Sequence, residues 1–279
     1  MITSPARVFQ HRTRAGRHMA EMSGFVEPSS PILALRGIGK TYGAIVALEG
    51  VDLDVHRGDV LALCGDNGAG KSTLIKIISG AEEPSSGTMT LRDETVAFGS
   101  PYDALTKGVA TIYQDLALAP RLSIYENVFM GGELTRSLGL PFLKVLDRRR
   151  MAREAKSYLA RLSVTIDDTR RPISGLSGGQ RQAVAISRAL HWNAEIIIMD
   201  EPTAALGVKE TAQVLDLVRR LKADGHTIIL ISHNMRDVVE VATRIAVLKS
   251  GRKIIDRSID GLTADDLSHM IMTGRDKTH

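Results

Sequence analysis

The sequence contains little that could cross-link the chain or carry it through a membrane. Cys64 is its single cysteine, so no internal disulfide bond can form, and one cysteine cannot build a zinc site by itself. Such sparing use of cysteine fits a reducing compartment. No uninterrupted apolar run exceeds five residues, whereas a helix needs about 20 to span a bilayer. The sequence therefore predicts no disulfide framework and no membrane-spanning segment.

The chain also lacks a basic excess outside its first twenty residues. Residues 1–20 contain four arginines and no acid, and the whole chain has 36 lysines and arginines against 32 aspartates and glutamates. Beyond residue 20 the two signs therefore balance. A nucleic-acid-binding surface needs basic residues clustered on a folded face, and the one candidate cluster, Arg148–Arg150, has acids nearby. We expect no nucleic-acid partner and assign residues 1–30 to a disordered basic tail.

What the sequence does have is the composition of a globular protein, with 43% hydrophobic and 24% charged residues. Pro28–Pro31 separates the tail from a body at 31–279, in which short apolar segments alternate with helical patterns. The predicted strands are Ile32–Leu35, Val51–Val55, Val60–Cys64, Thr88–Leu91, Val109–Tyr113, Ile196–Met199, Thr227–Ile231, Ile245–Lys249 and Lys253–Ile255. The predicted helices are Ser72–Ser79, Tyr102–Lys107, Arg148–Leu162, Ser177–Leu190 and Lys209–Asp224.

This alternation predicts an α/β sheet. The first ninety residues are the richer in strands, so we expect a strand-rich N-terminal subdomain. No strand is predicted between about 115 and 190, where we expect an inserted helical subdomain.

A glycine-rich segment follows one of the predicted strands. Gly65–Ser72 reads Gly-Asp-Asn-Gly-Ala-Gly-Lys-Ser and fits the phosphate-loop pattern between a strand and a helix. Glycines let backbone N–H groups turn toward phosphate oxygens, Lys71 adds a cation, and the Ser72 hydroxyl can bind Mg²⁺. A glycine-rich turn without a ligand is the competing interpretation, and the flanking strand and helix favour phosphate binding.

Polar side chains come at or just after the ends of three further predicted strands. They are Gln114, the pair Asp200 and Glu201, and His233. Because ligands bind at the carboxyl ends of the strands in α/β sheets, we expect these residues to meet the phosphate loop at one site. Asp200 can hold Mg²⁺, and Glu201 can orient or deprotonate an attacking water. Taken alone, two acids after a strand are commonplace, and a histidine there is more often a surface loop residue.

A fourth motif precedes a predicted helix. Leu176–Gln180 reads Leu-Ser-Gly-Gly-Gln, in which Ser177 is a natural N-cap. The two glycines expose backbone amides at the positive end of the helix. From composition alone, a plain capped helix explains this segment as well as a binding site does.

In this order the motifs resemble those of the ATP-binding subunits of ABC transporters, from about Ile32 to Gly274. The matching positions are Tyr42 (aromatic loop), Gly65–Thr73 (Walker A), Gln114 (Q-loop), Leu176–Gln180 (signature), Ile196–Glu201 (Walker B) and His233 (switch histidine). The resemblance implies a P-loop NTPase of the ABC type, with ATP and Mg²⁺ as cofactors. One departure is Gly207, where many members carry an aspartate, so contacts made by that aspartate are not assumed here.

The resemblance also implies a role for each matched position. The implied nucleotide-binding residues are Tyr42, Gly65, Asp66, Asn67, Gly68, Ala69, Gly70, Lys71, Ser72 and Thr73, and, toward the ATP of a second subunit, Ser177, Gly178, Gly179 and Gln180. The implied Mg²⁺-binding residues are Ser72, Gln114 and Asp200, and the implied catalytic residues are Lys71, Gln114, Glu201 and His233. One copy of each motif implies a homodimer.

More specifically, Glu201–Glu210 and Ser232–Met235 resemble bacterial sugar importers of the ribose, xylose and fructose type. A single cassette is similar to the fructose-type members. This implies an ATPase that powers monosaccharide uptake through separate membrane permease subunits, with a periplasmic sugar-binding protein as an indirect partner. It would act as a peripheral protein on the cytoplasmic face of the bacterial inner membrane.

Three alternatives stay open at this point. The first is a non-transport ABC ATPase that acts on nucleic acid or ribosomes, the second is a binding module with degenerate catalysis, and the third is an importer or exporter subunit for another solute. The sequence does not name the sugar.

Overall fold

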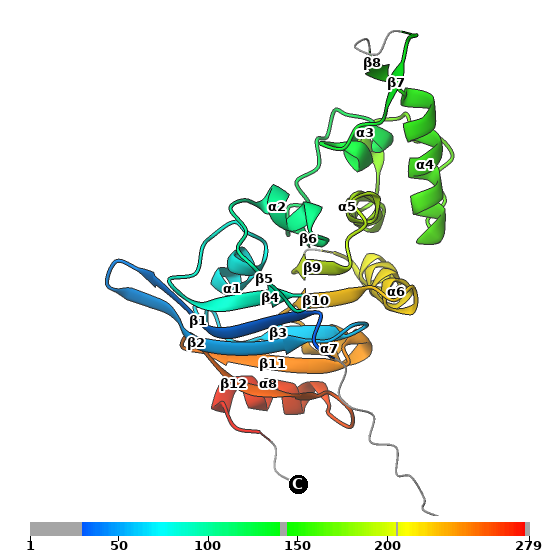
Figure 1. The fold of residues 1–279 in the computed structure, drawn as a ribbon. Helices are drawn as coiled ribbons and strands as arrows, with labels where there is room; N and C mark the ends of the chain where they lie inside the picture. Colours follow the sequence, from blue (N-terminus) through cyan, green and yellow to red (C-terminus); the bar gives the residue numbers. More distant parts are fainter. Residues whose placement is uncertain (1–29, 140–143, 205, 277–279) are drawn as a thin grey trace, which may run out of the picture.

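The computed structural model describes residues 30–139, 144–204 and 206–276 (Figure 1). The predicted tail, except for Ser30, lies outside these residues. The described part is an α/β fold with two larger sheets and a small hairpin, which confirms the predicted fold class. Among the described helices, none is both long and apolar enough to span a bilayer.

A six-stranded sheet forms the centre of the fold, in the order β12-β11-β3-β10-β9-β6. Its strands are β3 (Val60–Cys64), β6 (Val109–Ile112), β9 (Ile196–Asp200), β10 (Thr227–Ile231), β11 (Arg244–Lys249) and β12 (Arg252–Ser258). All are parallel to their neighbours except β12, which pairs antiparallel with β11. Every residue of β3 and β10 is buried, because both faces of the sheet are covered.

The two faces of this sheet belong to different hydrophobic cores. Leu61 and Ile198 pack on the side of α1 (Lys71–Ile78) and the second sheet, whereas Ala62 and Ile197 pack on the other side. The helices of that other side are α5 (Gly178–His191), α6 (Val208–Ala223), α7 (Met235–Val241) and α8 (Ala264–Thr273). The sheet is therefore held between two apolar layers.

The second sheet is antiparallel, in the order β2-β1-β4-β5. Its strands are β1 (Leu33–Tyr42), β2 (Ile45–Val55), β4 (Ser86–Leu91) and β5 (Glu94–Val96). The strands predicted for the first two elements are much shorter than β1 and β2. The register between β1 and β2 shifts near Gly37 and Gly50, which are both at positive φ. The alternation of apolar residues therefore breaks at these points, although the two strands remain paired.

A third body consists of α3 (Ile124–Phe129) and α4 (Arg148–Arg161), which stand away from both sheets in Figure 1 and pack against α5. The expectation of no strand between 115 and 190 is wrong, because β7 (Thr135–Ser137) and β8 (Lys144–Leu146) pair antiparallel. Each has three residues, and only Val145 is half-buried, so no apolar run signalled these strands. A short 3₁₀ turn, η1 (Ile173–Gly175), leads into α5.

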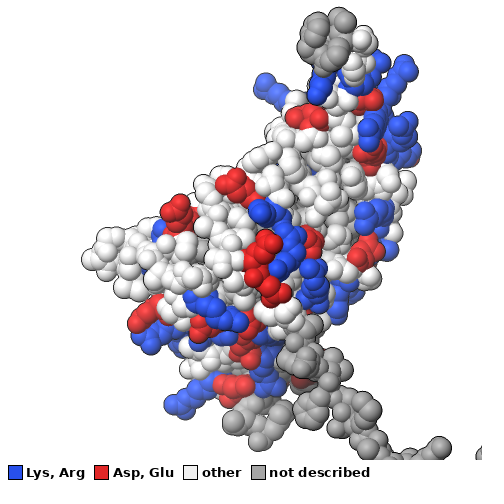
Figure 2. All heavy atoms as spheres, viewed as in Figure 1, with Lys and Arg blue, Asp and Glu red and all other residues white. Residues whose placement is uncertain are grey.

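The charged side chains differ between these bodies. In Figure 2, basic and acidic side chains are interspersed over the sheets, whereas basic ones gather at the outer end of the helical body. There Arg148 and Arg149 are exposed at the start of α4, and Arg150 pairs with Glu154 at 2.7 Å. The acid expected near this basic cluster is therefore in contact with one of its three arginines.

Several short elements were not predicted from the sequence, namely β5, α3, α7 and α8. The signals for α8 were present, since Thr263 and Asp266 form a capping box and Gly274, at φ 69°, ends the helix. The remaining helix, α2 (Pro101–Thr106), begins after the N-cap Ser100 with proline in its first turn. It lies close to its predicted position.

Candidate functional site

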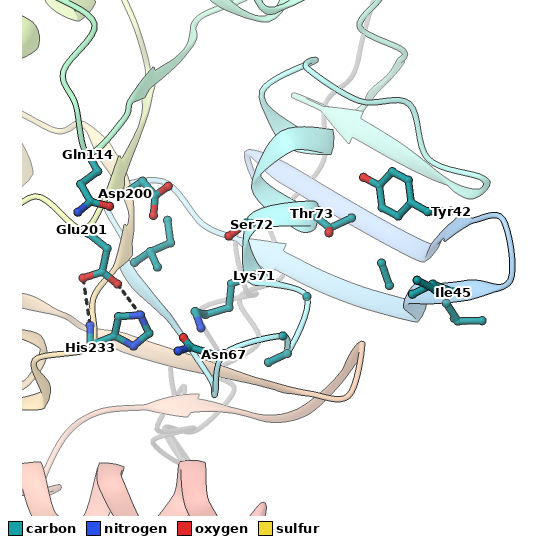
Figure 3. A pocket seen from close by; sticks show the side chains of 16 residues that line it. Tyr42, Ile45, Asn67, Lys71, Ser72, Thr73, Gln114, Asp200, Glu201 and His233 are labelled. Atoms are coloured by element: carbon teal, nitrogen blue, oxygen red, sulfur yellow. Dashed lines mark hydrogen bonds and ion pairs between the residues drawn. The ribbon is translucent and has the colours of Figure 1, made fainter.

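A cavity of about 520 Å³ opens where the strands of the six-stranded sheet end (Figure 3). It brings together predicted residues from five separate segments of the sequence. Its lining residues are Tyr42, Ile45, Val46, Ala47, Asn67, Gly68, Ala69, Gly70, Lys71, Ser72, Thr73, Gln114, Asp200, Glu201, Ile231 and His233. The structure therefore brings the ends of these strands to the phosphate loop, as the sequence predicted.

The phosphate loop joins β3 to α1. Gly70 is the N-cap of α1 at φ 104° and has no side chain, so the first N–H groups of the helix receive no side-chain cap from it. Lys71 is buried, and its Nζ donates to the carbonyl oxygens of Gly65 at 2.6 Å and Asp66 at 3.0 Å. A cation and free amide donors therefore meet on one loop, which is an arrangement suited to phosphate.

Gly65 and Asp66 occupy the back of this loop. They line a neighbouring cavity of about 300 Å³ together with Ser232 and residues of α8. A Cβ atom on Gly65 would lie 2.3 Å from the carbonyl oxygen of Leu248, so only glycine fits there. In this structure the two residues hold Lys71 through their carbonyl groups rather than face the main cavity.

Glu201 and His233 form a direct pair inside the cavity. His233 Nε2 lies 3.0 Å from Glu201 Oε1, and the His233 backbone N–H donates to Glu201 Oε2 at 3.4 Å (Figure 3). Burial raises the pKa of the Glu201 carboxyl, and the adjacent His233 partly offsets this rise. A carboxylate with a raised pKa is a better proton acceptor near neutral pH. Glu201 also has φ 51°, an uncommon backbone conformation for a residue with a side chain.

Three oxygen-bearing side chains at this cavity suit a hard cation. They are the Ser72 hydroxyl, the Gln114 carboxamide and the Asp200 carboxylate. Burial raises the pKa of Asp200, and nearby Lys71 lowers it. Among the described residues, no group of three or more acidic, histidine or cysteine side chains could form an all-protein metal cage. Mg²⁺ uses one or two carboxylates with water and substrate phosphates, so this donor set fits it.

The far end of the cavity is apolar. Tyr42, Ile45 and Val46 flank the turn between β1 and β2, with 41%, 69% and 56% of their surfaces exposed. Lys40 Nζ lies 5.1 Å from the centre of the Tyr42 ring. Tyr42 was predicted from the sequence as a nucleotide-binding residue, whereas Ile45 and Val46 were not. The sequence signal for these two residues was an apolar pair shortly after the tight turn at Gly43, because the tip of a hairpin does not bury such side chains.

The signature residues lie elsewhere. Among the described residues, the walls of the main cavity include none of Ser177–Gln180; Gly178 lines a second cavity, and Gly179 and Gln180 a third. Ser177 caps α5 by accepting from the Gln180 N–H at 3.3 Å, and the Gln180 side chain accepts from the Ser177 N–H at 3.1 Å. The structure therefore separates these four residues from the other predicted nucleotide-binding residues of the same chain.

Glu210 holds the start of the signature helix, and sequence reasoning assigned it no role. Its Oε1 accepts from the Gly178 N–H at 3.0 Å, and its Oε2 accepts from the Gly207 N–H at 3.4 Å. One carboxylate thus bridges the N-termini of α5 and α6. Gly207 is the N-cap of α6 at φ −74°, with open space around its Cβ position.

The family model described as "ABC transporter" matches residues 48–204. Among curated proteins, the chain is 44% identical to the xylose/arabinose import ATP-binding protein of Sulfolobus acidocaldarius, over 87% of this chain and 94% of that one. It is 46% identical to the fructose import ATP-binding protein of Rhizobium meliloti, over 80% and 87%. A ribose import ATP-binding protein of Escherichia coli O157:H7 is 41% identical over 88% of this chain, which spans about half of that relative's length.

Solved structures of ATP-binding cassettes share the fold. The ADP conformation of one ABC transporter cassette aligns with a TM-score of 0.72 at 27% identity, over 87% of this chain and 95% of that one. A dimeric bacterial ABC transporter cassette aligns with a TM-score of 0.66 at 26% identity, over 82% and 100%. The chain therefore belongs to the ABC transporter family as one of its ATPases, and it binds and hydrolyses ATP.

Proposed function

We propose that this protein powers the import of a monosaccharide through separate permease subunits. The observation that carries the proposal is the single cavity that holds Lys71, Asp200 and the Glu201–His233 pair, because together these groups supply charge, a metal ligand and a base. The relatives named above import xylose or arabinose, fructose and ribose. These names favour sugar import over a role on nucleic acid or ribosomes and over the other solutes considered.

Residues 31–279 are proposed to form one ABC ATPase domain, with the segment at about 115–190 as its helical subdomain. The protein would bind permease subunits at the cytoplasmic face of the inner membrane, and a periplasmic sugar-binding protein would act on it only through them. Because nothing here names one sugar, the substrate class is left as a monosaccharide.

In the proposed mechanism different parts of the cavity bind different parts of the ATP molecule. Tyr42 stacks on the adenine ring, beside the apolar side chains of Ile45 and Val46. The N–H groups of the phosphate loop bind the phosphates, and Lys71 holds the β- and γ-phosphoryl oxygens. Ser72, Gln114 and Asp200 hold Mg²⁺, which when bound neutralises charge on the phosphate oxygens.

Hydrolysis is proposed to take place at the end of the cavity that holds Glu201 and His233. Glu201 orients a water molecule and accepts its proton as the water attacks the γ-phosphorus in line with the departing ADP. His233 contacts Glu201 from the neighbouring strand end, and in the proposed mechanism it would also contact the γ-phosphate. The raised pKa of Glu201 strengthens its action as a base.

The signature residues Ser177, Gly178, Gly179 and Gln180 are proposed to bind the ATP of a second copy of the chain. This assignment is supported by their absence from the described walls of their own ATP cavity and by the dimeric structure of a related cassette. Each ATP would then lie between two subunits and join them.

The variant Glu201→Gln tests this two-subunit site. It removes the base and a negative charge near the γ-phosphate, so ATP should persist between two subunits, and light scattering with Mg-ATP should show a dimer. Adding Ser177→Arg should dissolve the dimer by placing a bulky cation at the seam. The matched control is Thr135→Arg on the exposed strand β7, which should leave it intact. A strictly monomeric Glu201→Gln protein at saturating ATP, alone and with its permease, would refute the two-subunit site.

A further inference from the structure

Asp237 is a buried carboxylate that the proposed mechanism does not use. It lies in the first turn of α7 with 6% of its surface exposed, outside the walls of the ATP cavity. Its Oδ2 accepts from Thr203 Oγ1 at 2.8 Å, and its Oδ1 accepts from Asn234 Nδ2 at 2.9 Å. Within the described chain, no lysine, arginine or histidine forms an ion pair with it. Both oxygens are thus committed to neutral donors.

The two donors come from the two segments that carry the hydrolytic pair. Thr203 lies two residues after Glu201, beyond β9, and Asn234 directly follows His233, beyond β10. The strands are already joined at this point, because the Glu201 N–H donates to the Ile231 carbonyl oxygen at 3.0 Å. Beyond the strands, Asp237 is a side-chain link between the two segments.

The Glu201 segment needs such a link because its backbone is not in a relaxed conformation. A residue with a side chain keeps a positive φ only where its surroundings hold it there, and Glu201 has φ 51°. The next residue is fixed from one side, since Gln182 of α5 donates its Nε2–H to the Pro202 carbonyl oxygen at 2.8 Å. The bond from Thr203 to Asp237 fixes the segment from the other side.

We propose that Thr203, Asn234 and Asp237 form a latch that sets the position of the Glu201 carboxylate relative to His233 during hydrolysis. The proposal rests on the roles proposed above for Glu201 and His233. The three latch residues are positioning residues, since none of them lines the ATP cavity. Releasing the latch should therefore slow the chemical step and leave ATP binding unchanged.

The test compares near-isosteric variants of Thr203 by steady-state ATPase kinetics. Thr203→Val removes the hydroxyl and leaves a buried acceptor unpaired, so kcat should fall about tenfold, since small misplacements of a reacting group are costly. The KM for ATP should stay within about twofold of the wild-type value, because the contacts that bind ATP equally in the ground state and in the transition state do not change. Thr203→Ser keeps the hydroxyl and should restore kcat. Thr135→Val, on the exposed strand β7, is the matched control and should change neither parameter.

A second variant approaches the latch from its other donor. Asn234→Asp keeps an oxygen that can accept from the Arg236 N–H, as the α7 cap requires, but it faces Asp237 with an acceptor and a like charge. It too should lower kcat without raising KM. Melting temperatures and binding of a non-hydrolysable ATP analogue, measured on both variants, separate positioning from loss of fold.

The outcomes are distinguishable. Wild-type kcat in both Thr203→Val and Asn234→Asp would overturn the latch, and so would an equal loss of kcat in Thr203→Ser. A parallel loss of nucleotide binding and melting temperature would assign these residues to the fold and would also overturn it. Glu201→Gln with wild-type turnover would instead refute the proposed roles of the hydrolytic pair, which is a separate failure.

Discussion

Two glycine-rich loops lead into helices of this protein, and they treat the helix N-terminus in opposite ways. The phosphate loop enters α1 through Gly70, which has no side chain to cap the helix. The signature loop enters α5 through Ser177, whose hydroxyl accepts from the Gln180 N–H, while Glu210 takes the Gly178 N–H. The N–H groups at the start of α1 therefore stay available to a ligand, whereas some of those at the start of α5 already bond to side chains of the same chain.

The charges around the two helix starts differ in the same way. Lys71 puts a buried cation at the first residue of α1, whereas α5 receives the carboxylate of Glu210. The Lys71 cation adds to the attraction that the positive end of α1 has for a phosphate, whereas the Glu210 carboxylate stabilises the positive end of α5 itself. A glycine-rich loop before a helix is therefore no guide to its ligand until the partners of its N–H groups are known.

The largest effect is expected for Lys71→Ala. This change removes the cation of the phosphate loop from a site that depends on charge stabilisation, so ATP turnover should fall by about 100-fold or more. Release of radiolabelled phosphate measures it. Lys76→Ala, at an exposed position of the same helix, should have little effect. Turnover of Lys71→Ala within about twofold of wild type would remove the assignment of this loop.

Glycine substitutions should also separate the two loops. Gly70 has φ 104°, and a Cβ there would lie 2.7 Å from Leu48 Cδ2 and 2.8 Å from the Ala47 carbonyl oxygen. Gly70→Ala should therefore cost about 1–3 kcal/mol of unfolding free energy. Gly175, before the signature, has open space around its Cβ and no positive φ, so Gly175→Ala should be neutral or stabilising by up to about 1 kcal/mol. Urea unfolding of the two variants checks the difference, and equal losses would contradict it.

The carboxylate on the signature helix should have a smaller effect on stability. Glu210→Ala leaves the Gly178 N–H without its acceptor, which should cost about 1–2 kcal/mol in urea unfolding. Glu210→Gln keeps one acceptor oxygen and should lie between this variant and wild type. Lys209→Ala, an exposed neighbour in the same helical turn, serves as the control. If Glu210→Ala matched wild type, the α5 start would be stable without Glu210, and the contrast between the loops would weaken.

The smallest effect concerns the other helix start that Glu210 contacts. Gly207 has φ −74° and open space around its Cβ, so Gly207→Asp can supply a true N-cap to α6. An aspartate cap exceeds glycine by a few tenths of a kcal/mol, and the unfolding free energy should rise by about that amount. Nucleotide affinity of the single subunit should not change, because Gly207 lies outside the cavity walls. A loss of stability would contradict the cap geometry.

How far the sequence predicts this protein depends on how local each feature is. The phosphate loop, the signature cap and the buried strands β3, β9 and β10 follow from residues within a few positions of one another. The strands β7 and β8 could not be predicted, because their pairing is not accompanied by burial. The lengths of β1 and β2 were underestimated for a related reason, since bulges interrupt the alternation that marks a strand.

The site shows the same division. By itself the sequence determined which residues bear the chemistry, because glycine spacing, Lys71 and the two acids at the end of β9 are tied to one turn or one strand end. Only the tertiary structure decided which of them meet. The parallel order of β6, β9, β10 and β3 placed Gln114, Glu201 and His233 around one cavity.

The tertiary structure alone also brought Ile45 and Val46 to that cavity, and it joined Thr203 to Asp237, 34 positions away, and Gly178 to Glu210, 32 positions away. The physical reason is that these contacts form between elements that packing brings together. No periodicity or spacing along the chain records which buried donor will face which acceptor.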